Sequence, residues 1–312
     1  MKVVVFGATG DQGRAQVRAL AQAGHTPLAV SRGGNHASAF GGEVQPLRAD
    51  FGDHGSLARA VAAGDAVFIN LPSTSFQAAA PLVAATAAIA GAARAAGSRA
   101  IVFNTSLPVP RDKLGFAAQD ARHEMRRAVL DAGVPAVIVQ PVVFLDNLLK
   151  AWAWPSIAAS GTIVYPHKET LDVSWICHDD LAALMVAALE RPALAGSIFD
   201  VGGPDTVRGP ELARRLGAAW GHPIAFRSQS IEDFCAGMNA VFERVATLEA
   251  DRLVGELGRI YRWYNEAPEH PFKVDMAPVL AKLPVTLTPI ATWAARQTLP
   301  GPIGGPAGSP AA

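Results

Sequence analysis

Residues 3–14 read VVVFGATGDQGR, and this stretch decides how the rest of the chain is interpreted. The apolar, β-branched start is typical of a buried parallel strand. Gly7, Gly10 and Gly13 follow at intervals of three residues, and a helical apolar pattern comes next. In a dinucleotide-binding loop the first glycine allows a sharp turn, the second lets the backbone approach a pyrophosphate, and the third allows close helix packing. An ordinary tight turn is the alternative, but a second strand expected at 27–31 favours nucleotide binding.

Composition excludes several classes of protein. The chain has 312 residues, half of them hydrophobic. Lys and Arg together number 27, and Asp and Glu together also number 27. This balance argues against nucleic acid or an anionic membrane as the main partner. The two cysteines, Cys177 and Cys235, lie far apart, so we expect no disulfide framework and no metal site. A reducing, cytoplasmic location fits best, with no signal peptide before the first strand.

Strands alternate with helices along the first half of the chain, which predicts an α/β, Rossmann-type doubly wound parallel sheet. The run 78–96 is alanine-rich and interrupted by Pro81, so it is interpreted as a buried helix, not a membrane span. A helix is predicted over 56–63, with Ser56 as its N-cap. The predicted strands after the first are 27–31, 44–49, 66–71, 100–104 and 136–140.

The alternation breaks after Pro141, which predicts a division of the chain. Residues 1–141 would form the NAD(P)-binding domain, and 142–298 a smaller C-terminal α/β substrate-binding region, with a strand at 171–176. The Pro/Gly/Ala-rich end, 299–312, is predicted to be disordered.

Ligands of parallel sheets bind at the carboxyl ends of the strands, so the segments after Pro141 are placed to wall a substrate site. Phe144, Trp152 and Trp154 are the predicted lining of an apolar pocket. Ordinary packing is the alternative interpretation of the two tryptophans. His167 and His178 lie in the same half and either could donate a proton, although histidines next to caps and turns are usually structural.

Several motifs recur together in one known group of proteins. They are GATGDQG at 7–13, Ser31-Arg32, Asp50-Phe51, RHEMRRAV at 122–129, GVP at 133–135, QP at 140–141 and FLDN at 144–147. On these motifs residues 1–147 resemble the atypical short-chain dehydrogenase/reductases, specifically the NmrA-like group and its isoflavone-reductase relatives. The resemblance implies a Rossmann fold that binds NADP(H).

The resemblance and the strand ends together predict the cofactor site. The loop contributes Gly7, Thr9, Gly10, Asp11, Gln12 and Gly13. Ser31 and Arg32 follow the second strand, where NAD-specific proteins usually carry an acidic residue for the ribose diol. A hydroxyl and a guanidinium suit a 2′-phosphate instead, which predicts NADP(H).

Three further strand ends complete the predicted cofactor site. Asp50 and Phe51 resemble a pair that contacts the adenine, although Asp50 could simply cap the next helix. Asn70, Leu71 and Pro72 end the fourth strand beside the expected cofactor path, where a turn alone would explain them nearly as well. Thr105 and Ser106 end the fifth strand; Ser106 matches a catalytic Ser/Thr position of related enzymes, or is a plain loop hydroxyl.

The chain departs from its relatives in the catalytic pair. Classical members use Tyr and Lys four residues apart, but Tyr165, Tyr261 and Tyr264 have no such lysine. The isoflavone-reductase relatives carry a lysine early on the helix before the sixth strand, and the matching residue here is Arg122. Arginine stays protonated, so it cannot be a general base, but it could polarise a substrate carbonyl. A solvated surface arginine is the alternative.

Two functions follow from these motifs. The first is an NADPH-dependent reductase that transfers hydride to a small, apolar conjugated acceptor such as a quinone, enone or imine, for which no tyrosine is needed. The second is a non-catalytic NADP(H)-binding redox sensor or transcriptional regulator of the NmrA type, acting through a protein partner. Homo-oligomerisation is compatible with both.

Overall fold

The computed structural model describes residues 1–33, 40, 44–71, 79–243 and 250–303, with the backbone alone for 239–243 and 250–254. The chain forms two compact units. Unit 1 contains Met1–Pro141, His178–Val201 and Ala277–Val285. Unit 2 contains Val142–Cys177, Gly202–Met276 and the residues from Thr286 onward.

Unit 1 is built on a seven-stranded sheet with the order β3-β2-β1-β4-β5-β6-β8. All its strand pairs are parallel. Its strands are β1 (Lys2–Val5), β2 (Thr26–Ser31), β3 (Gln45–Arg48), β4 (Ala66–Asn70), β5 (Ala100–Asn104), β6 (Ala136–Pro141) and β8 (Ile198–Val201). The chain order reverses at β1, which lies between β2 and β4, so the predicted Rossmann-type α/β fold is confirmed.

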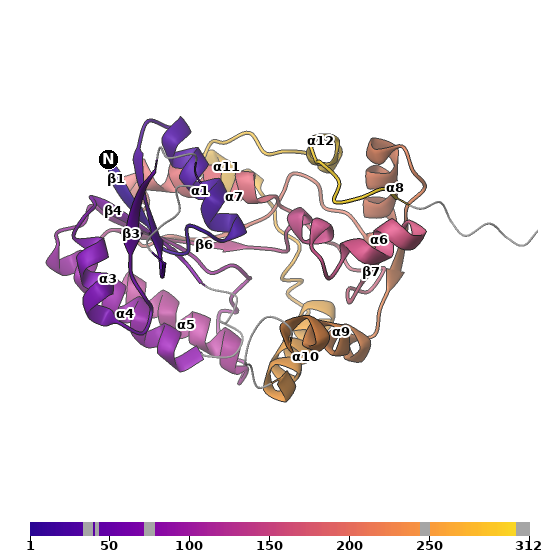
Figure 1. Cartoon of the computed structure of the whole chain (residues 1–312), viewed down its shortest axis with the longest axis horizontal. Helices are drawn as coiled ribbons and strands as arrows, with labels where there is room; N and C mark the ends of the chain where they lie inside the picture. The colour runs from indigo at the N-terminus through magenta and orange to yellow at the C-terminus, as the bar shows by residue number, and fades with distance from the viewer. Residues whose placement is uncertain (34–39, 41–43, 72–78, 244–249, 304–312) are drawn as a thin grey trace, which may run out of the picture. The chain divides into compact units, whose positions relative to one another are not determined.

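Helices cover both faces of this sheet (Figure 1). One face carries α1 (Asp11–Gln22) and α7 (His178–Leu189), which pack on each other. The other carries α3 (His54–Val61), α4 (Ala79–Ala95) and α5 (Ala117–Leu130), packed in that order. A short 3-10 turn (Pro192–Leu194) follows α7, and α11 (Ala277–Lys282) contacts β8.

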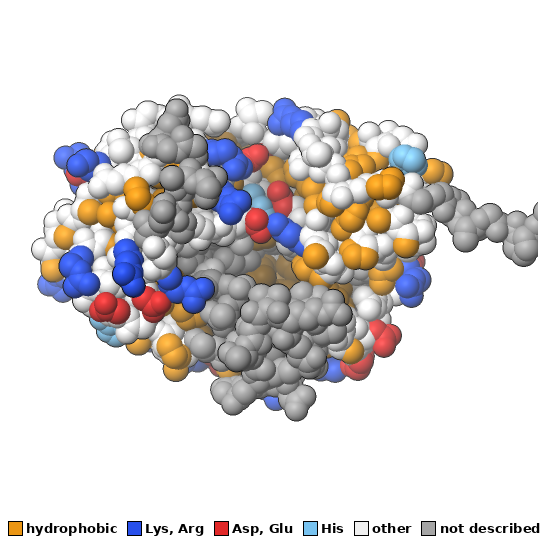
Figure 2. Space-filling view, viewed as in Figure 1, with side chains coloured by type: hydrophobic (Ala, Val, Ile, Leu, Met, Phe, Trp, Pro, Cys, Tyr) orange, Lys and Arg blue, Asp and Glu red, His pale blue; other side chains and the backbone are white. Residues whose placement is uncertain are grey.

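The core beneath α3, α4 and α5 explains why these segments fold as they do. Phe6, Ile69 and Phe103 point from the strands into this layer and are fully buried. Leu82 and Ile89 meet them from the buried face of α4. None of the helices described is both long and apolar enough to cross a membrane. On the outside, over α3 and α4, basic and acidic side chains are interspersed (Figure 2).

The start of α3 differs from the expectation. The N-cap is Asp53, whose carboxylate accepts the Ser56 N–H over 3.0 Å, and the helix begins at His54. The Ser56 hydroxyl points back to the Asp53 carbonyl, 2.7 Å away. A carboxylate is a strong acceptor at a helix N-terminus, so Asp53 takes the capping position three residues before the predicted one.

The predicted division at Pro141 also differs from the structure. Pro141 does end the first segment of unit 1, but His178–Val201 and Ala277–Val285 belong to unit 1 as well. They return because α7 packs on α1, and because β8 covers the edge of β6, which would otherwise expose unpaired backbone groups. Most of the tail predicted to be disordered lies outside the described residues, and Ile303 at their end is buried.

Unit 2 combines one small sheet with helices. Two parallel strands, β7 (Thr162–Tyr165) and β9 (Ala225–Ser228), pair with each other. The strand predicted at 171–176 is wrong: Val173 and Ile176 form only isolated bridges, to Val207 and Phe144. The helices of unit 2 are a 3-10 helix (Leu145–Leu149), α6 (Trp154–Ser160), α8 (Gly209–Trp220), α9 (Ile231–Glu243), α10 (Ala250–Glu266) and α12 (Ile290–Ala295).

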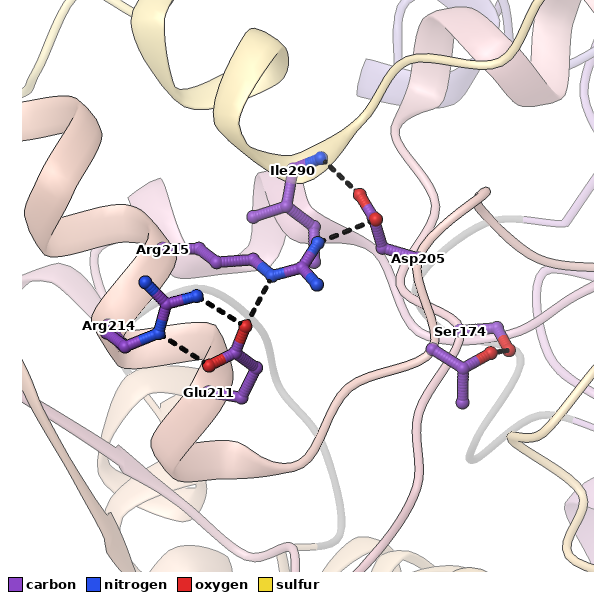
Figure 3. Close-up of polar contacts among 7 residues, drawn as sticks. Ser174, Asp205, Glu211, Arg214, Arg215 and Ile290 are labelled. Atoms are coloured by element: carbon purple, nitrogen blue, oxygen red, sulfur yellow. Dashed lines mark hydrogen bonds and ion pairs between the residues drawn. The ribbon is translucent and has the colours of Figure 1, made fainter.

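A polar cluster connects α8 to α12 within unit 2 (Figure 3). Arg215 donates to Glu211 over 2.8 Å and to Asp205 over 2.6 Å. The second Asp205 oxygen accepts the Ile290 N–H, 2.9 Å away, at the first turn of α12. Hydrogen bonds from Arg214 and Arg215 lower the pKa of Glu211 to about 2, so the cluster remains charged at neutral pH. It therefore fixes α12 against α8.

Candidate functional site: a glycine loop above a buried amide network

The glycine loop follows β1 at the carboxyl edge of the sheet. Gly7 has a φ of +71°, which only glycine adopts without strain. A Cβ on Gly7 would lie 3.1 Å from Asn70 Cβ, so the turn packs directly against the end of β4. The Gly7 carbonyl accepts the Gly10 N–H over 3.0 Å, which closes the turn before α1.

Gly13 and Gly10 have opposite surroundings. A Cβ on Gly13 would overlap the Gly7 carbonyl oxygen and lie 2.7 Å from Ala8 Cα, so the fold itself requires glycine there. A Cβ on Gly10 would meet only the Gly7 oxygen at 3.4 Å, an ordinary contact, and the φ of Gly10 is −72°. The chain's own packing therefore does not require glycine at position 10.

This arrangement fits a dinucleotide diphosphate. Gly10 is the N-cap of α1, so the first N–H groups of the helix lie beside an exposed residue that has no side chain. Such a helix end binds phosphate through its N–H groups and its partial positive charge. Arg14 supports the loop, because its Nε donates to the Thr9 carbonyl over 3.0 Å.

The end of β2 carries the residues predicted for the 2′-phosphate. Ser31 ends the strand and Arg32 is exposed beside it. Ser31 pairs in register with Arg48 at the end of β3, so a second cation lies at this edge. Arg48 was not among the predicted site residues, because only strand pairing reveals that it neighbours Ser31.

We expect Arg32→Ala to weaken NADPH binding about tenfold to a hundredfold, because a charge-assisted bond to phosphate contributes about 1.5–3 kcal/mol. NADH binding should change little, since NADH lacks the 2′-phosphate. Calorimetric titration with both cofactors measures the difference, and Arg59→Ala on α3 is a matched control. Equal losses for NADPH and NADH would show that Arg32 does not read the phosphate.

The Asp50-Phe51 pair has structural contacts of its own. Asp50 Oδ1 accepts the Gly52 N–H over 2.8 Å and so orders the turn after β3. The Phe51 ring lies 6.2 Å from the Phe6 ring. Asp50 does not cap α3, which excludes that alternative, and adenine contact stays a prediction. Leu71 is half-buried against the core, and Pro72 lies outside the described residues.

A network of side-chain amides lies directly beneath the glycine loop. Asn70 and Gln16 of α1 exchange two hydrogen bonds, both 2.7 Å long. Asn70 Nδ2 also donates to the Phe6 carbonyl over 2.9 Å, and Asn70 Oδ1 accepts from Asn104 over 2.9 Å. Both asparagines are buried, so these bonds are shielded from water.

The network continues from β5 to the first turn of α1. Asn104 Nδ2 donates to Gln12 Oε1 over 2.6 Å, and Asn104 Oδ1 accepts the Ser106 N–H over 2.8 Å. Asn70 and Gln12 were predicted site residues, whereas Asn104 and Gln16 were not. The sequence does contain a feature that points to Asn104, because the fourth and fifth predicted strands both carry an asparagine near their ends. In the structure these residues, Asn70 and Asn104, are paired in register.

Ser106 and Thr105 differ in what their hydroxyls contact. Ser106 has a φ of +62°, an unusual conformation for a residue with a Cβ, and its Oγ lies 3.4 Å from Gln12 Oε1. Thr105 is fully buried and its hydroxyl donates to the Leu107 carbonyl over 2.7 Å. Strained backbone is common at functional sites, so Ser106 stays a candidate, whereas the Thr105 hydroxyl has a structural use.

Arg122 is fully buried, so the alternative of a solvated surface arginine is wrong. Its Nε donates to the Thr105 carbonyl over 3.1 Å, and its Nη1 to the Ala118 carbonyl over 2.8 Å. The side chain thus connects α5 to the loop that carries Ser106. A direct role at the substrate stays a prediction.

Arg126, one turn further along α5, is also buried, and burial lowers its pKa while Asp200 acts in the opposite direction. Its Nη1 donates to Gln140 Oε1 over 3.0 Å, and Gln140 Nε2 donates to Asp200 over 2.7 Å. This chain joins α5 to the carboxyl ends of β6 and β8.

The residues predicted to line the substrate pocket all lie in unit 2. Trp152 contacts the rings of Tyr165 and Phe234, with centroids 5.6 and 5.8 Å away. Trp154 is buried against Trp220 of α8, and Phe144 is buried as well. These contacts fit the packing interpretation of the tryptophans, and the pocket lining stays a prediction.

His167 lies inside an aromatic cluster of unit 2. Its ring centroid is 4.6 Å from that of Tyr165, 5.1 Å from Phe272 and 5.7 Å from Trp175. Burial lowers the pKa of His167 to about 3 and raises that of Tyr165 to about 12. Neither side chain therefore exchanges a proton readily at neutral pH. In the described part of the chain, no cluster of His, Cys, Asp or Glu has the arrangement of a metal site.

The parallel sheet, its reversal at β1 and the glycine loop define a Rossmann-type α/β protein. Residues 1–291 match the NmrA-like family, and the chain belongs to that family.

The proteins similar to this chain include two curated relatives and a solved structure. The (4-alkanoyl-5-oxo-2,5-dihydrofuran-3-yl)methyl phosphate reductase of Streptomyces griseus is 29% identical, over 74% of this chain and 78% of the relative. The NAD(P)H azoreductase of Xenophilus azovorans is 30% identical, over the same shares. The Citrobacter sp. triphenylmethane reductase complexed with NADP(H) has a TM-score of 0.73 at 18% identity, over 96% of this chain and all of that one.

Proposed function

We propose that this protein is an NADPH-dependent reductase that transfers hydride to a small conjugated acceptor such as a quinone, enone or imine. The observation that carries the proposal concerns Gly10. The fold leaves room for a Cβ at this position, and the close approach of a diphosphate explains why the residue has no side chain. Both curated relatives are reductases, one of them named for NAD(P)H, which supports a reductase as the general class.

In this proposal the residues at different strand ends contact different parts of the cofactor and the acceptor. The first turn of α1 binds the diphosphate, while Ser31, Arg32 and Arg48 offer a hydroxyl and cations to a 2′-phosphate. Bound NADPH supplies the hydride, and the protein supplies orientation. Ser106, held by the amide network, is the residue proposed to orient the acceptor. Conjugated acceptors delocalise the developing charge, so protonation by water suffices and no Tyr–Lys pair is required.

The proposal predicts loss of NADPH absorbance with members of a panel of quinones, enones, cyclic imines and azo dyes. Gly10→Val is the matched blank, because it should be folded and unable to bind the cofactor. Turnover by the wild type that the blank lacks supports the proposal. If NADPH binds but the whole panel is unreactive, the reductase proposal fails and a cofactor-binding regulator explains the site instead.

A further inference from the structure

The orientation of the amide network is fixed at both ends by backbone groups. The Phe6 carbonyl can only accept, so the Asn70 atom that faces it at 2.9 Å is Nδ2. The Ser106 N–H can only donate, so the Asn104 atom that faces it at 2.8 Å is Oδ1. Amide nitrogen and oxygen are usually assigned from their partners, and here those partners leave one arrangement.

This arrangement determines how the Gln12 side chain is oriented. With its oxygen on Ser106, Asn104 turns its nitrogen to Asn70 Oδ1 at 2.9 Å and to Gln12 Oε1 at 2.6 Å. The Ser106 hydroxyl lies 3.4 Å from the same Gln12 oxygen. Gln12 Oε1 therefore faces the network and Nε2 faces away from it. Within the described residues, Nε2 makes no hydrogen bond to the protein.

Gln12 is the second residue of α1 and is half-buried beside the exposed Gly10. Its outward Nε2 carries two N–H donors at the helix end where phosphate is favoured. The reverse orientation would present the Oε1 lone pairs to the phosphate and repel it.

We propose that Asn104 is a positioning residue, which holds the Gln12 amide so that Nε2 donates to the diphosphate of NADPH. This inference rests on the proposed function for the identity of the dinucleotide. The proposal explains why a polar residue is buried at position 104. From inside the sheet, Asn104 determines the orientation of the Gln12 amide at the cofactor loop.

The first test is Gln12→Glu. A glutamate keeps an inward oxygen for Asn104 and replaces only the outward nitrogen with a charged oxygen. NADPH affinity should fall about tenfold to a hundredfold, because a charge-assisted bond is replaced by repulsion. The thermal midpoint of the free protein should match the wild type, since the network is retained. Calorimetry and a thermal melt without ligand measure the two quantities.

Gln22→Glu is the matched control, because it makes the same charge change at the exposed last residue of α1. It should leave NADPH affinity within about twofold of the wild type. Equal affinities for Gln12→Glu and Gln22→Glu would overturn the proposal.

The second test places Asn104→Asp in the wild type and in Gln12→Met. An aspartate still accepts the Ser106 N–H but cannot donate, so Gln12 should turn Nε2 inward and lose affinity for NADPH. Methionine has no amide to turn, so the further change in that background should stay within about twofold. An equal loss in both backgrounds would show that Asn104 acts through general structure. If Asn104→Asp does not fold, Asn104→Ala in the same two backgrounds makes the same comparison, because alanine removes the amide that orients Gln12.

These measurements need no acceptor, so they separate this inference from the proposed function. NADPH binding that responds as expected, without reduction of any acceptor, supports the inference and rejects the reductase. Acceptor reduction by the wild type, together with an unchanged NADPH affinity in Gln12→Glu, supports the reductase and rejects the inference.

Discussion

Gly10→Val is expected to remove NADPH binding and leave the protein folded. The φ of −72° and ψ of 164° at position 10 suit any L-residue, and a Cβ meets only one oxygen at 3.4 Å. The free energy of unfolding should fall by only about 1 kcal/mol, because valine is a poorer N-cap than glycine. The branched side chain would occupy the space that the diphosphate must enter, so calorimetry should detect no NADPH binding.

Gly13→Ala, three residues away, is expected to have the opposite effect, which is to destabilise the fold. Its single methyl group would overlap the Gly7 carbonyl and the Ala8 backbone, which cannot move without opening the turn. We expect a destabilisation of about 3 kcal/mol, at the upper end of overpacking costs, measured by urea unfolding. If Gly10→Val still binds NADPH with unchanged affinity, the diphosphate does not lie at this loop.

The second large effect is a loss of folding stability in acid, which His167→Phe should reduce. The unfolded chain protonates this histidine below its ordinary pKa of 6.5, whereas the buried ring resists protonation until about pH 3. Between these values the unfolded state binds more protons. The free energy of unfolding should therefore fall as the pH falls, by about 1.4 kcal/mol per pH unit from this group.

Phenylalanine does not titrate and suits the aromatic surroundings, and neither nitrogen of His167 has a hydrogen-bond partner among the described residues to lose. Urea unfolding at several pH values between about 4 and 7 should show a shallower acid slope for His167→Phe than for the wild type. The exposed His222 of unit 2 provides the control, as His222→Gln should keep the wild-type slope. Identical slopes for all three proteins would contradict the burial effect.

The local pattern of unit 1 can be predicted from the residues alone. The β-branched run, the glycines at 7, 10 and 13 and the following amphipathic helix require a strand, a tight turn and a helix, whatever surrounds them. The later alternation of apolar strands and helices predicts a parallel sheet. Parallel neighbouring strands need crossover connections, and the helices between the strands supply them. Residues whose role depends on chain geometry alone, such as Gly7, were therefore found without a structure.

Which strand ends and side chains meet depends on how the chain packs. Gln12, Asn70 and Asn104 are far apart along the chain, and their hydrogen bonds exist because the start of α1 lies beside the adjacent ends of β4 and β5. The burial of Arg122 and the return of 178–201 to unit 1 were equally hidden, since both depend on what packs against them. Sequence spacing records local periodicity, whereas burial and long-range hydrogen bonds depend on surfaces that come together only on folding.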